Sequence, residues 1–387
     1  MKHQLSFTQN SGQCPFGHIL NSVCFVIVFI APHTILSVSS PELNTVINSV
    51  FAVLFLIYTF VNINALPKNF TSRSVSIFAI ALVMFCIPRF LIYQKFSFFD
   101  ILAPLMAVVG YFIVLKKKLR LVVLEVFLIS LYVFFTVTFF SKLTSLQDVS
   151  IISTRDYYGS SSINSIPIAL INTLYIYIVI VFLQKEDKKR KIFFFALINF
   201  FFCIVQQSRS GVALSSLIFI YSFYLRFSNK SIRVLGIVSL FLGFLYLSTT
   251  AIFPNYFDMI GNMNGFRSLE QDVRGNAVMY FFENQTFGSI LFGYEPGTEF
   301  AYDIYYTFNT FLDFWNHYTL FGLLLLVGYS IYRMRKYKKF YFPLYYFIPF
   351  LIYSLVEPRY LPAHWDFFIY LMLFVPAKYD NNKFPVE

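Results

Sequence analysis

Charge is scarce in this sequence, and its scarcity decides the class of protein. Asp, Glu, Lys and Arg make up 13% of the 387 residues, whereas 58% are hydrophobic and 21% are aromatic. The mean hydropathy is correspondingly high, at +0.65. A soluble domain of this length needs more charge than this to cover its surface. The composition therefore excludes an ordinary soluble protein and predicts an integral membrane protein.

Cysteines and short chemical motifs are also few. The four cysteines are Cys14, Cys24, Cys86 and Cys203. Their spacing is not that of metal ligands, and no outer loop holds two of them. They are therefore expected to be structural thiols. The chain lacks a Gly-rich phosphate loop with its Lys, a dinucleotide-binding fingerprint and a His-x-x-x-His pair. These absences exclude the common nucleotide and zinc chemistries, so we expect no cofactor and no metal.

Long apolar stretches organise the whole chain. They cover 19–38, 45–66, 75–93, 98–115, 120–141, 165–183, 192–206, 211–226, 234–252, 306–332, 340–356 and 360–377. Most are long enough to cross a bilayer, and in hydrocarbon only a helix satisfies its own backbone polar groups locally. No internal repeat divides the chain. The sequence predicts an all-α, polytopic membrane helix bundle of about twelve spans, with residues 1–387 forming a single integral membrane domain.

Basic residues fall mostly on one side of this series of spans. The inner side carries Lys2, Lys68, Arg73, Lys116, Lys117, Lys118, Arg120, Lys185, Lys188, Lys189, Arg190, Lys191, Arg226, Lys230, Arg233, Arg333, Arg335, Lys336, Lys338, Lys339, Lys378 and Lys383. The outer side carries Arg89, Lys95, Lys142, Arg155, Arg209, Arg267, Arg274 and Arg359. The positive-inside rule then predicts that both termini face the cytoplasm. The net charge of +11 is explained by loops that meet anionic lipid headgroups, so we expect the lipid bilayer and no nucleic acid as a partner.

A large outer loop covers residues 253–305. Loops of more than about 15 residues in compact proteins are usually functional or disordered. Apolar pairs within this one, such as Phe281-Phe282 and Ile290-Leu291, predict short amphipathic helices on the membrane surface. Gly293 and Gly297 bracket a turn and suggest a close approach of the backbone to another group.

Three outer arginines are candidates for binding an anion. Arg209 lies in a short turn between two spans, Arg274 lies in the large loop, and Arg359 lies in the last outer turn. Outer positive charge opposes the topology rule, and a guanidinium grips phosphate oxygens with two parallel hydrogen bonds. The alternatives are an arginine that snorkels to lipid headgroups at position 209, and local ion pairs at positions 274 and 359.

Polar residues share one face at the start of the span 306–332. Asn309, Asp313, Asn316 and His317 follow the spacing of a helical face. Ionisable groups in a span are costly and usually face a cavity or a partner. A neutral His317 could act as a general base, with Asp313 placed to orient it. The alternative is that these groups form hydrogen bonds between helices.

Taken together and in this order, these motifs resemble the O-antigen polymerase and O-antigen ligase superfamily. The turn at 208–211, Ser-Arg-Ser-Gly, resembles the family's Ser-Arg-Ser/Gly-Gly turn. Arg274, followed by the glycines at 288, 293 and 297, resembles the arginine and Gly-x-Gly-x-Gly stretch of a large periplasmic loop. The segment 309–312, Asn-Thr-Phe-Leu, running on to Gly322, resembles the family's His-Asn-Thr-Tyr-Leu…Gly-x-x-Gly signature.

Two positions depart from that signature. Phe308 stands where the family often has His, and Thr319 stands where it often has the first Gly. That His is the base proposed for the ligase, so its replacement favours a polymerase. His317 is then a local substitute for the base by proximity alone.

The resemblance implies a metal-independent glycosyltransferase of the bacterial inner membrane. A sugar hydroxyl of one repeat unit would attack the anomeric carbon of a glycan held by undecaprenyl diphosphate, at the periplasmic face. Arg209 and Arg274 would stabilise the diphosphate as it leaves, with Asn309 and His317 on the acceptor side and Asp313 and Arg359 binding substrate. It also implies a chain-length regulator protein as a partner.

Two other functions stay open at this stage. An O-antigen ligase would use the same donor but transfer finished polymer to lipid A core. A flippase for lipid-linked oligosaccharides also has about a dozen spans, but it usually lines a central cavity with charges from many helices and shows two related halves. Here the polarity concentrates on the outer side.

Overall fold

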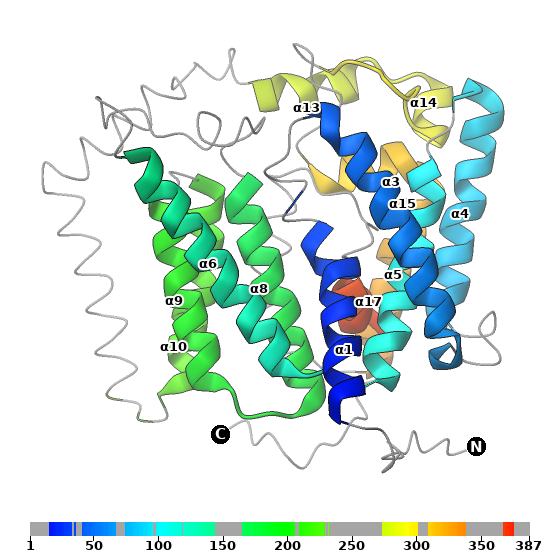
Figure 1. Ribbon diagram of the computed structural model, residues 1–387. Helices are drawn as coiled ribbons and strands as arrows, with labels where there is room; N and C mark the ends of the chain where they lie inside the picture. Colours follow the sequence, from blue (N-terminus) through cyan, green and yellow to red (C-terminus); the bar gives the residue numbers. More distant parts are fainter. Residues whose placement is uncertain are drawn as a thin grey trace, which may run out of the picture.

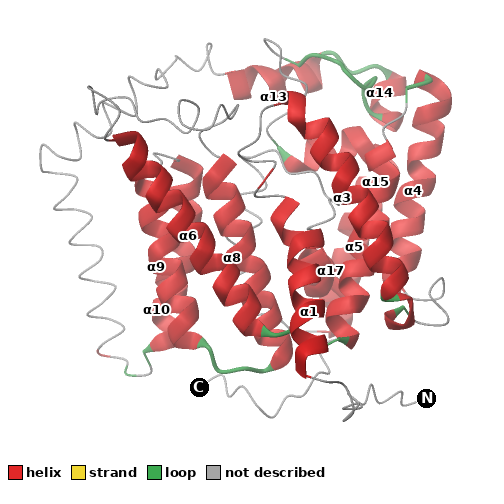
Figure 2. Ribbon diagram, in the orientation of Figure 1, coloured by secondary structure: helices red, strands yellow, loops and turns green. Residues whose placement is uncertain are grey.

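A computed structural model describes residues 15–32, 35, 41–66, 74–95, 98–117, 119–143, 165–205, 209–227, 229, 231, 273–300, 309–337 and 367–374. Every regular element within these residues is a helix, and none of them forms a strand (Figures 1 and 2). The all-α prediction is therefore confirmed for this part of the chain.

Fourteen helical elements are described. They are α1 (Pro15–Phe25), the π-helix η1 (Val26–Ile30), α3 (Pro41–Val61), the 3-10 helix η2 (Ile63–Ala65), α4 (Ser74–Tyr93), α5 (Phe98–Lys116), α6 (Leu121–Leu143), α8 (Ser165–Gln184), α9 (Lys189–Val205), α10 (Arg209–Arg226), α13 (Val273–Glu283), α14 (Phe287–Phe292), α15 (Thr310–Tyr337) and α17 (Phe367–Phe374). The longest is α15, which departs from helical geometry at Tyr318 and Thr319.

Three of these helices are long and apolar enough to cross a membrane. They lie at Ser74–Tyr93, Leu121–Thr138 and Ile166–Gln184, and α1, α3, α5 and α10 contribute shorter apolar segments. Their positions agree closely with the predicted spans 75–93, 120–141 and 165–183. The predicted spans 234–252 and 340–356 lie outside the described residues, so the number of twelve spans remains a prediction.

The helices pack in two groups. One group contains the α9–α10 hairpin with α8 and α6, and the other contains α4, α5, α15 and α17 (Figure 1). The short α17 packs on α5 and α4 and also reaches α8, and α1 reaches α6. Gly110 of α5 permits this close packing, because a Cβ there would lie 2.8 Å from Phe29 Cε1 and 2.9 Å from Phe367 Cβ.

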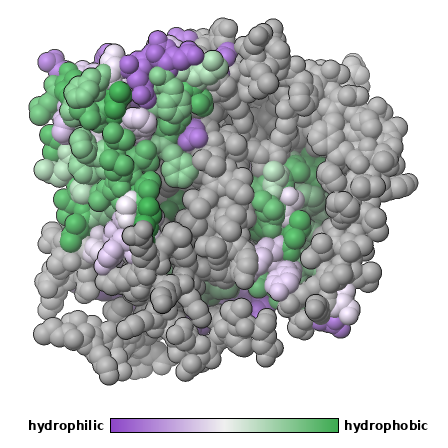
Figure 3. Space-filling view, turned by 180° about the vertical axis from the view of Figure 1, so that it is seen from behind, coloured by the Kyte–Doolittle hydropathy of each residue, from purple (hydrophilic) through white to green (hydrophobic). Residues whose placement is uncertain are grey.

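The outer surfaces of several helices are apolar. Along α6 one exposed stripe recurs at intervals of three or four residues, formed by Val122, Val126, Ile129, Val133 and Val137. Seen from behind, the described surface is apolar along the side of the bundle and hydrophilic along its upper edge (Figure 3). Such an apolar stripe is unfavourable in water and well solvated by lipid tails. The chain is therefore a membrane protein with a bilayer around its helices.

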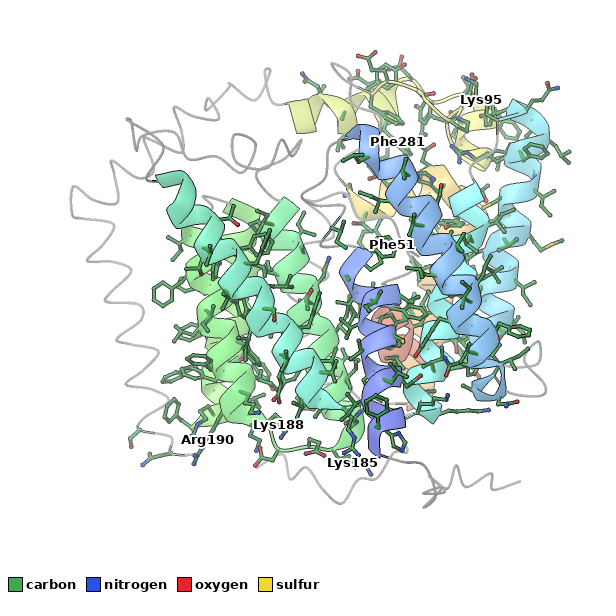
Figure 4. All side chains as sticks on the ribbon, viewed as in Figure 1. Phe51, Lys95, Lys185, Lys188, Arg190 and Phe281 are labelled. Atoms are coloured by element: carbon green, nitrogen blue, oxygen red, sulfur yellow. The ribbon has the colours of Figure 1, made fainter. Side chains whose placement is uncertain are left out.

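The two ends of the bundle differ in charge and in structure. Lys185, Lys188 and Arg190 lie at the end that we name the basic end, and Lys95 and Phe281 lie at the opposite end (Figure 4). At the basic end Lys191 forms a 2.5 Å ion pair with the buried Glu125. The opposite end, which we name the cap end, carries α13, α14 and the turn that follows them (Figure 1). Lys95 thus lies at the opposite end of the bundle from Lys185, Lys188 and Arg190, as the assignment of these residues to different sides predicts.

Candidate functional site

The cap end contains a small hydrophobic core of its own. Ala277, Phe281, Tyr294 and Phe300 are buried together, with Trp315 of α15 packed against them. The Tyr294 hydroxyl donates a 2.7 Å hydrogen bond to the Phe281 carbonyl. Burial raises the pKa of this phenol, so it stays protonated and remains a donor. Part of the predicted loop 253–305 is thus a folded cap with two short helices.

A capping box defines the start of α14. The Thr286 hydroxyl accepts a 3.1 Å hydrogen bond from the Ser289 amide, and the Ser289 hydroxyl accepts a 2.7 Å bond from the Thr286 amide. These bonds satisfy two backbone donors that a short helix otherwise leaves unpaired. The helix then ends at Gly293, whose φ of 77° turns the chain toward α4 and α15.

Residues 293–295 form a turn, and each of the three is held by a residue of α4 or by Lys95, which follows that helix. Tyr93 donates a 2.7 Å hydrogen bond from its hydroxyl to the Gly293 carbonyl. Arg89 donates to the Tyr294 carbonyl through Nη2 at 3.0 Å and Nε at 3.4 Å. Lys95 forms a 2.5 Å ion pair with Glu295. We name residues 293–295 the clasped turn.

The same turn is held from its other side by α15. The Tyr294 amide donates a 2.6 Å hydrogen bond to Asn316 Oδ1, and Trp315 Nε1 donates a 2.8 Å bond to the Ile290 carbonyl. A Cβ on Gly293 would lie only 2.9 Å from Asn316 Cα. The predicted close approach of the backbone at Gly293 is therefore confirmed. At Gly297 the predicted turn exists, with φ of 87°, but nothing lies within 4 Å of an added Cβ.

Helix α15 is broken just after the predicted polar face. Tyr318 has φ of −113° and Thr319 has φ of 65° with ψ of 169°. The second conformation is one that glycine adopts freely and that costs other residues about 1–3 kcal/mol. The sequence predicted one continuous span here, so the break is a correction. Residues 310–317 form a separate half-helix that faces the clasped turn.

The residues on the polar face of the half-helix have different roles. Asn309 caps the helix, since its Oδ1 accepts hydrogen bonds from the amides of Phe311 at 2.9 Å and Leu312 at 3.2 Å. Asn316 binds the clasped turn, and Asp313 is buried with 1% of its surface exposed. His317 is half-buried, and its carbonyl accepts a bond from Cys86 Sγ at 3.7 Å. The Asn316 bond goes to a turn and not to another helix, and the role of His317 as a base remains a prediction.

The three candidate arginines are described only in part. Arg209 is the first residue of α10, and Arg274 is the second residue of α13. Since α9 starts beside Arg190 at the basic end, the paired α10 starts at the cap end, where α13 also lies (Figures 1 and 4). The side chains of both arginines, and the whole of Arg359, lie outside the described residues.

Sequence reasoning missed the importance of Arg89. It entered only as one of the outer basic residues, yet only 5% of its surface is exposed and it bonds the clasped turn. The available signal was its position inside an apolar helix, where charged residues are rare and usually have a specific partner. The partner itself, 205 residues away in the sequence, gives no local signal.

In the part of the chain that the structure describes, no group of three His, Cys, Asp or Glu side chains could hold a metal ion. Comparison with protein-family models, with curated proteins and with solved structures found no match to this chain. The resemblance to the polymerase and ligase superfamily therefore remains a prediction from the motifs.

The two glycines of the cap provide a matched test of the clasped turn. Both have positive φ, but only Gly293 lies against backbone, so Gly293→Ala adds a clash with α15 to the conformational strain that Gly297→Ala causes alone. We expect Gly293→Ala to lower the thermal unfolding temperature of the detergent-purified protein clearly more than Gly297→Ala. Equal unfolding temperatures would contradict this account of the turn.

Proposed function

We propose that the protein is a polymerase of lipid-linked oligosaccharide repeat units. One observation supports this most. Residues 209 and 274 and the half-helix 310–317 come from distant parts of the sequence, and the helices that carry them all begin at the cap end. These are the segments that carry the family resemblance. A reaction that needs cations for a diphosphate and a base for a sugar hydroxyl requires such groups at one membrane face.

The proposed reaction is a glycosyl transfer between two lipid-linked glycans. The hydroxyl oxygen of the acceptor sugar forms a bond to the anomeric carbon of the donor glycan. The bond between that carbon and the diphosphate oxygen breaks, and undecaprenyl diphosphate leaves with the electron pair. The hydroxyl proton goes to a base, for which His317 is the candidate. Arg209 and Arg274 stabilise the charge that builds on the leaving diphosphate, so the transfer needs no metal.

Under this proposal the cap end faces the periplasm and the basic end faces the cytoplasm of an inner-membrane protein. Lys185, Lys188 and Arg190 belong to the basic end (Figure 4). Anionic lipid and the membrane potential both favour that end inside. The same proposal has both termini in the cytoplasm. It also includes Arg359 as a substrate contact and a chain-length regulator protein as a partner.

The break in α15 favours a flippase as the second candidate. Transporters often bind substrate where a membrane helix is interrupted, and the irregular backbone at Tyr318 and Thr319 fits that pattern. A flippase would leave repeat units on the cytoplasmic leaflet of a null strain. An O-antigen ligase would leave long polymer on its lipid carrier and none on lipid A core. The lipid and polymer content of a null strain separates all three.

The first prediction concerns the donor side. A null strain should carry single repeat units on lipid A core, and Arg209→Ala or Arg274→Ala should fail to restore long polymer, with transfer slowed by about 100-fold or more. Arg→Lys should recover little activity, because an ammonium cannot make the two-pronged contact.

The measurement for these arginine variants is the polysaccharide ladder on a gel at matched membrane expression. Arg190→Ala, an arginine at the basic end, is the control and should give a normal ladder. Normal ladders from both outer arginine variants would remove this mechanism.

The second prediction concerns the acceptor side. His317→Ala should shorten or abolish the ladder if the imidazole accepts the proton. Asn309→Ala should also shorten it, but this change removes a helix cap worth about 1 kcal/mol. Asn309→Ser preserves the cap without the amide, so it separates the two roles of this side chain. A normal ladder from Asn309→Ser together with a weak one from Asn309→Ala would assign Asn309 to capping alone.

The third prediction concerns orientation. In a cysteine-free background, Glu283→Cys on α13 should react with a membrane-impermeant maleimide added to intact spheroplasts, whereas Arg190→Cys should not. Both positions are exposed in the structure, so both should react after the membrane is permeabilised. The reverse labelling pattern would place the cap in the cytoplasm and contradict the proposal.

A further inference from the structure

Arg89 is a buried cation that the proposed reaction leaves without a role. It lies near the cap end of α4, with 5% of its surface exposed. Its Nη2 and Nε both donate to the Tyr294 carbonyl, at 3.0 and 3.4 Å. Burial of a guanidinium is costly, and two donors converging on one oxygen fix its direction as a single ammonium donor could not. The contact therefore restrains the position of the Tyr294 carbonyl.

The face of α4 that carries Arg89 contacts the end of the half-helix at His317. Cys86 and Tyr93 lie three residues before and four residues after Arg89, on the same helical face. Cys86 Sγ donates to the His317 carbonyl at 3.7 Å, and Tyr93 donates to the Gly293 carbonyl at 2.7 Å. Arg89 thus occupies the position on α4 between the contact to His317 and the contact to the clasped turn.

Tyr294 links the two helices through its own peptide groups. Its carbonyl accepts from Arg89 of α4, and its amide donates to Asn316 Oδ1 of α15 at 2.6 Å. Asn316 precedes His317, and the helix breaks immediately afterwards at Tyr318 and Thr319. Because of this break, continuous helical hydrogen bonding does not by itself fix the half-helix 310–317 to the rest of α15. Its position depends on the contacts with α4 and with the clasped turn.

We propose that Arg89 is a positioning residue for the glycosyl transfer, acting through Tyr294 and Asn316 on the location of His317. The inference rests on the proposed function and adds a residue that touches neither the donor nor the acceptor. A displacement of about 1 Å of a catalytic group can cost a rate factor of about 100. Loss of the two-pronged bond should therefore lower the rate of the chemical step and leave substrate binding almost unchanged.

The first test of this inference does not depend on catalysis. Hydrogen exchange of the purified protein in lipid nanodiscs should become faster in residues 293–295 and 310–317 of Arg89→Lys, and stay unchanged in α9 and α10. Arg89→Lys keeps the positive charge, which favours folding, and only protein eluting at the native size is measured. Lys95→Met is the matched control, since it removes an exposed ion pair to the same turn. Exchange in 310–317 that is equal in Arg89→Lys and wild type would overturn the inference.

The second test measures transfer with lipid-linked repeat units isolated from the null strain. Arg89→Lys should lower kcat by about 10- to 100-fold with little change in KM. Lys95→Met should retain the wild-type kcat. In a His317→Ala background Arg89→Lys should have no further effect, because the group that it positions is gone. A purely structural role would reduce the yield of folded protein and leave kcat per folded molecule unchanged.

The outcomes distinguish the inference from the proposed function. A wild-type protein that polymerises, together with a wild-type kcat in Arg89→Lys, overturns the role of Arg89 alone. If Arg89→Lys lowers kcat by the same factor in the wild-type and His317→Ala backgrounds, the role of Arg89 is also overturned. A wild-type protein that does not extend the isolated repeat units overturns the proposed function, and the catalytic role of Arg89 with it.

Discussion

The hydrogen bonding of backbone groups in an apolar environment is the constraint on which this structure depends. Hydrocarbon offers no partner for an amide or a carbonyl, so the described chain is helical wherever it can be. The clasped turn lies at the cap end, and its buried backbone groups meet the same requirement through two neighbouring helices. The Gly293 and Tyr294 carbonyls accept from α4, and the Tyr294 amide donates to α15. Irregular backbone is thus tolerated here because specific side chains surround it.

The break in α15 is a second segment of irregular backbone, and its conformational strain is higher. Thr319 is buried in a conformation that suits glycine, which is often present at this place in the family that the motifs resemble. A threonine persists in such a conformation only when the surrounding contacts determine it. The clasped turn and Cys86 contact the half-helix before the break, and Phe85 of α4 packs against Phe321 after it. The result is a short half-helix fixed mainly from outside its own chain segment.

The sequence predicted what depends on local composition and missed what depends on distant partners. The spans at α4 and α8 are correct to within one residue, because an apolar length is a direct consequence of the bilayer. The break in α15, the π-helix η1 and the partner of Arg89 have no comparable local signal. Asn309 shows a third case. An asparagine before an apolar run is a common helix cap, whereas its place in a polar face predicted a role on the acceptor side.

The contrast between the two ends of the bundle bears on which cations need a functional explanation. In the proposed orientation, topology accounts for the many lysines of the basic end, and Lys191 also pairs with Glu125. In the same orientation, positive charge at the cap end opposes the topology rule, so each cation there requires a specific partner. Lys95 has Glu295, and Arg89 has the Tyr294 carbonyl. For Arg209 and Arg274, at the starts of α10 and α13, the proposed function supplies such a partner in the diphosphate of the lipid carrier, whose charge grows as the glycosidic bond breaks.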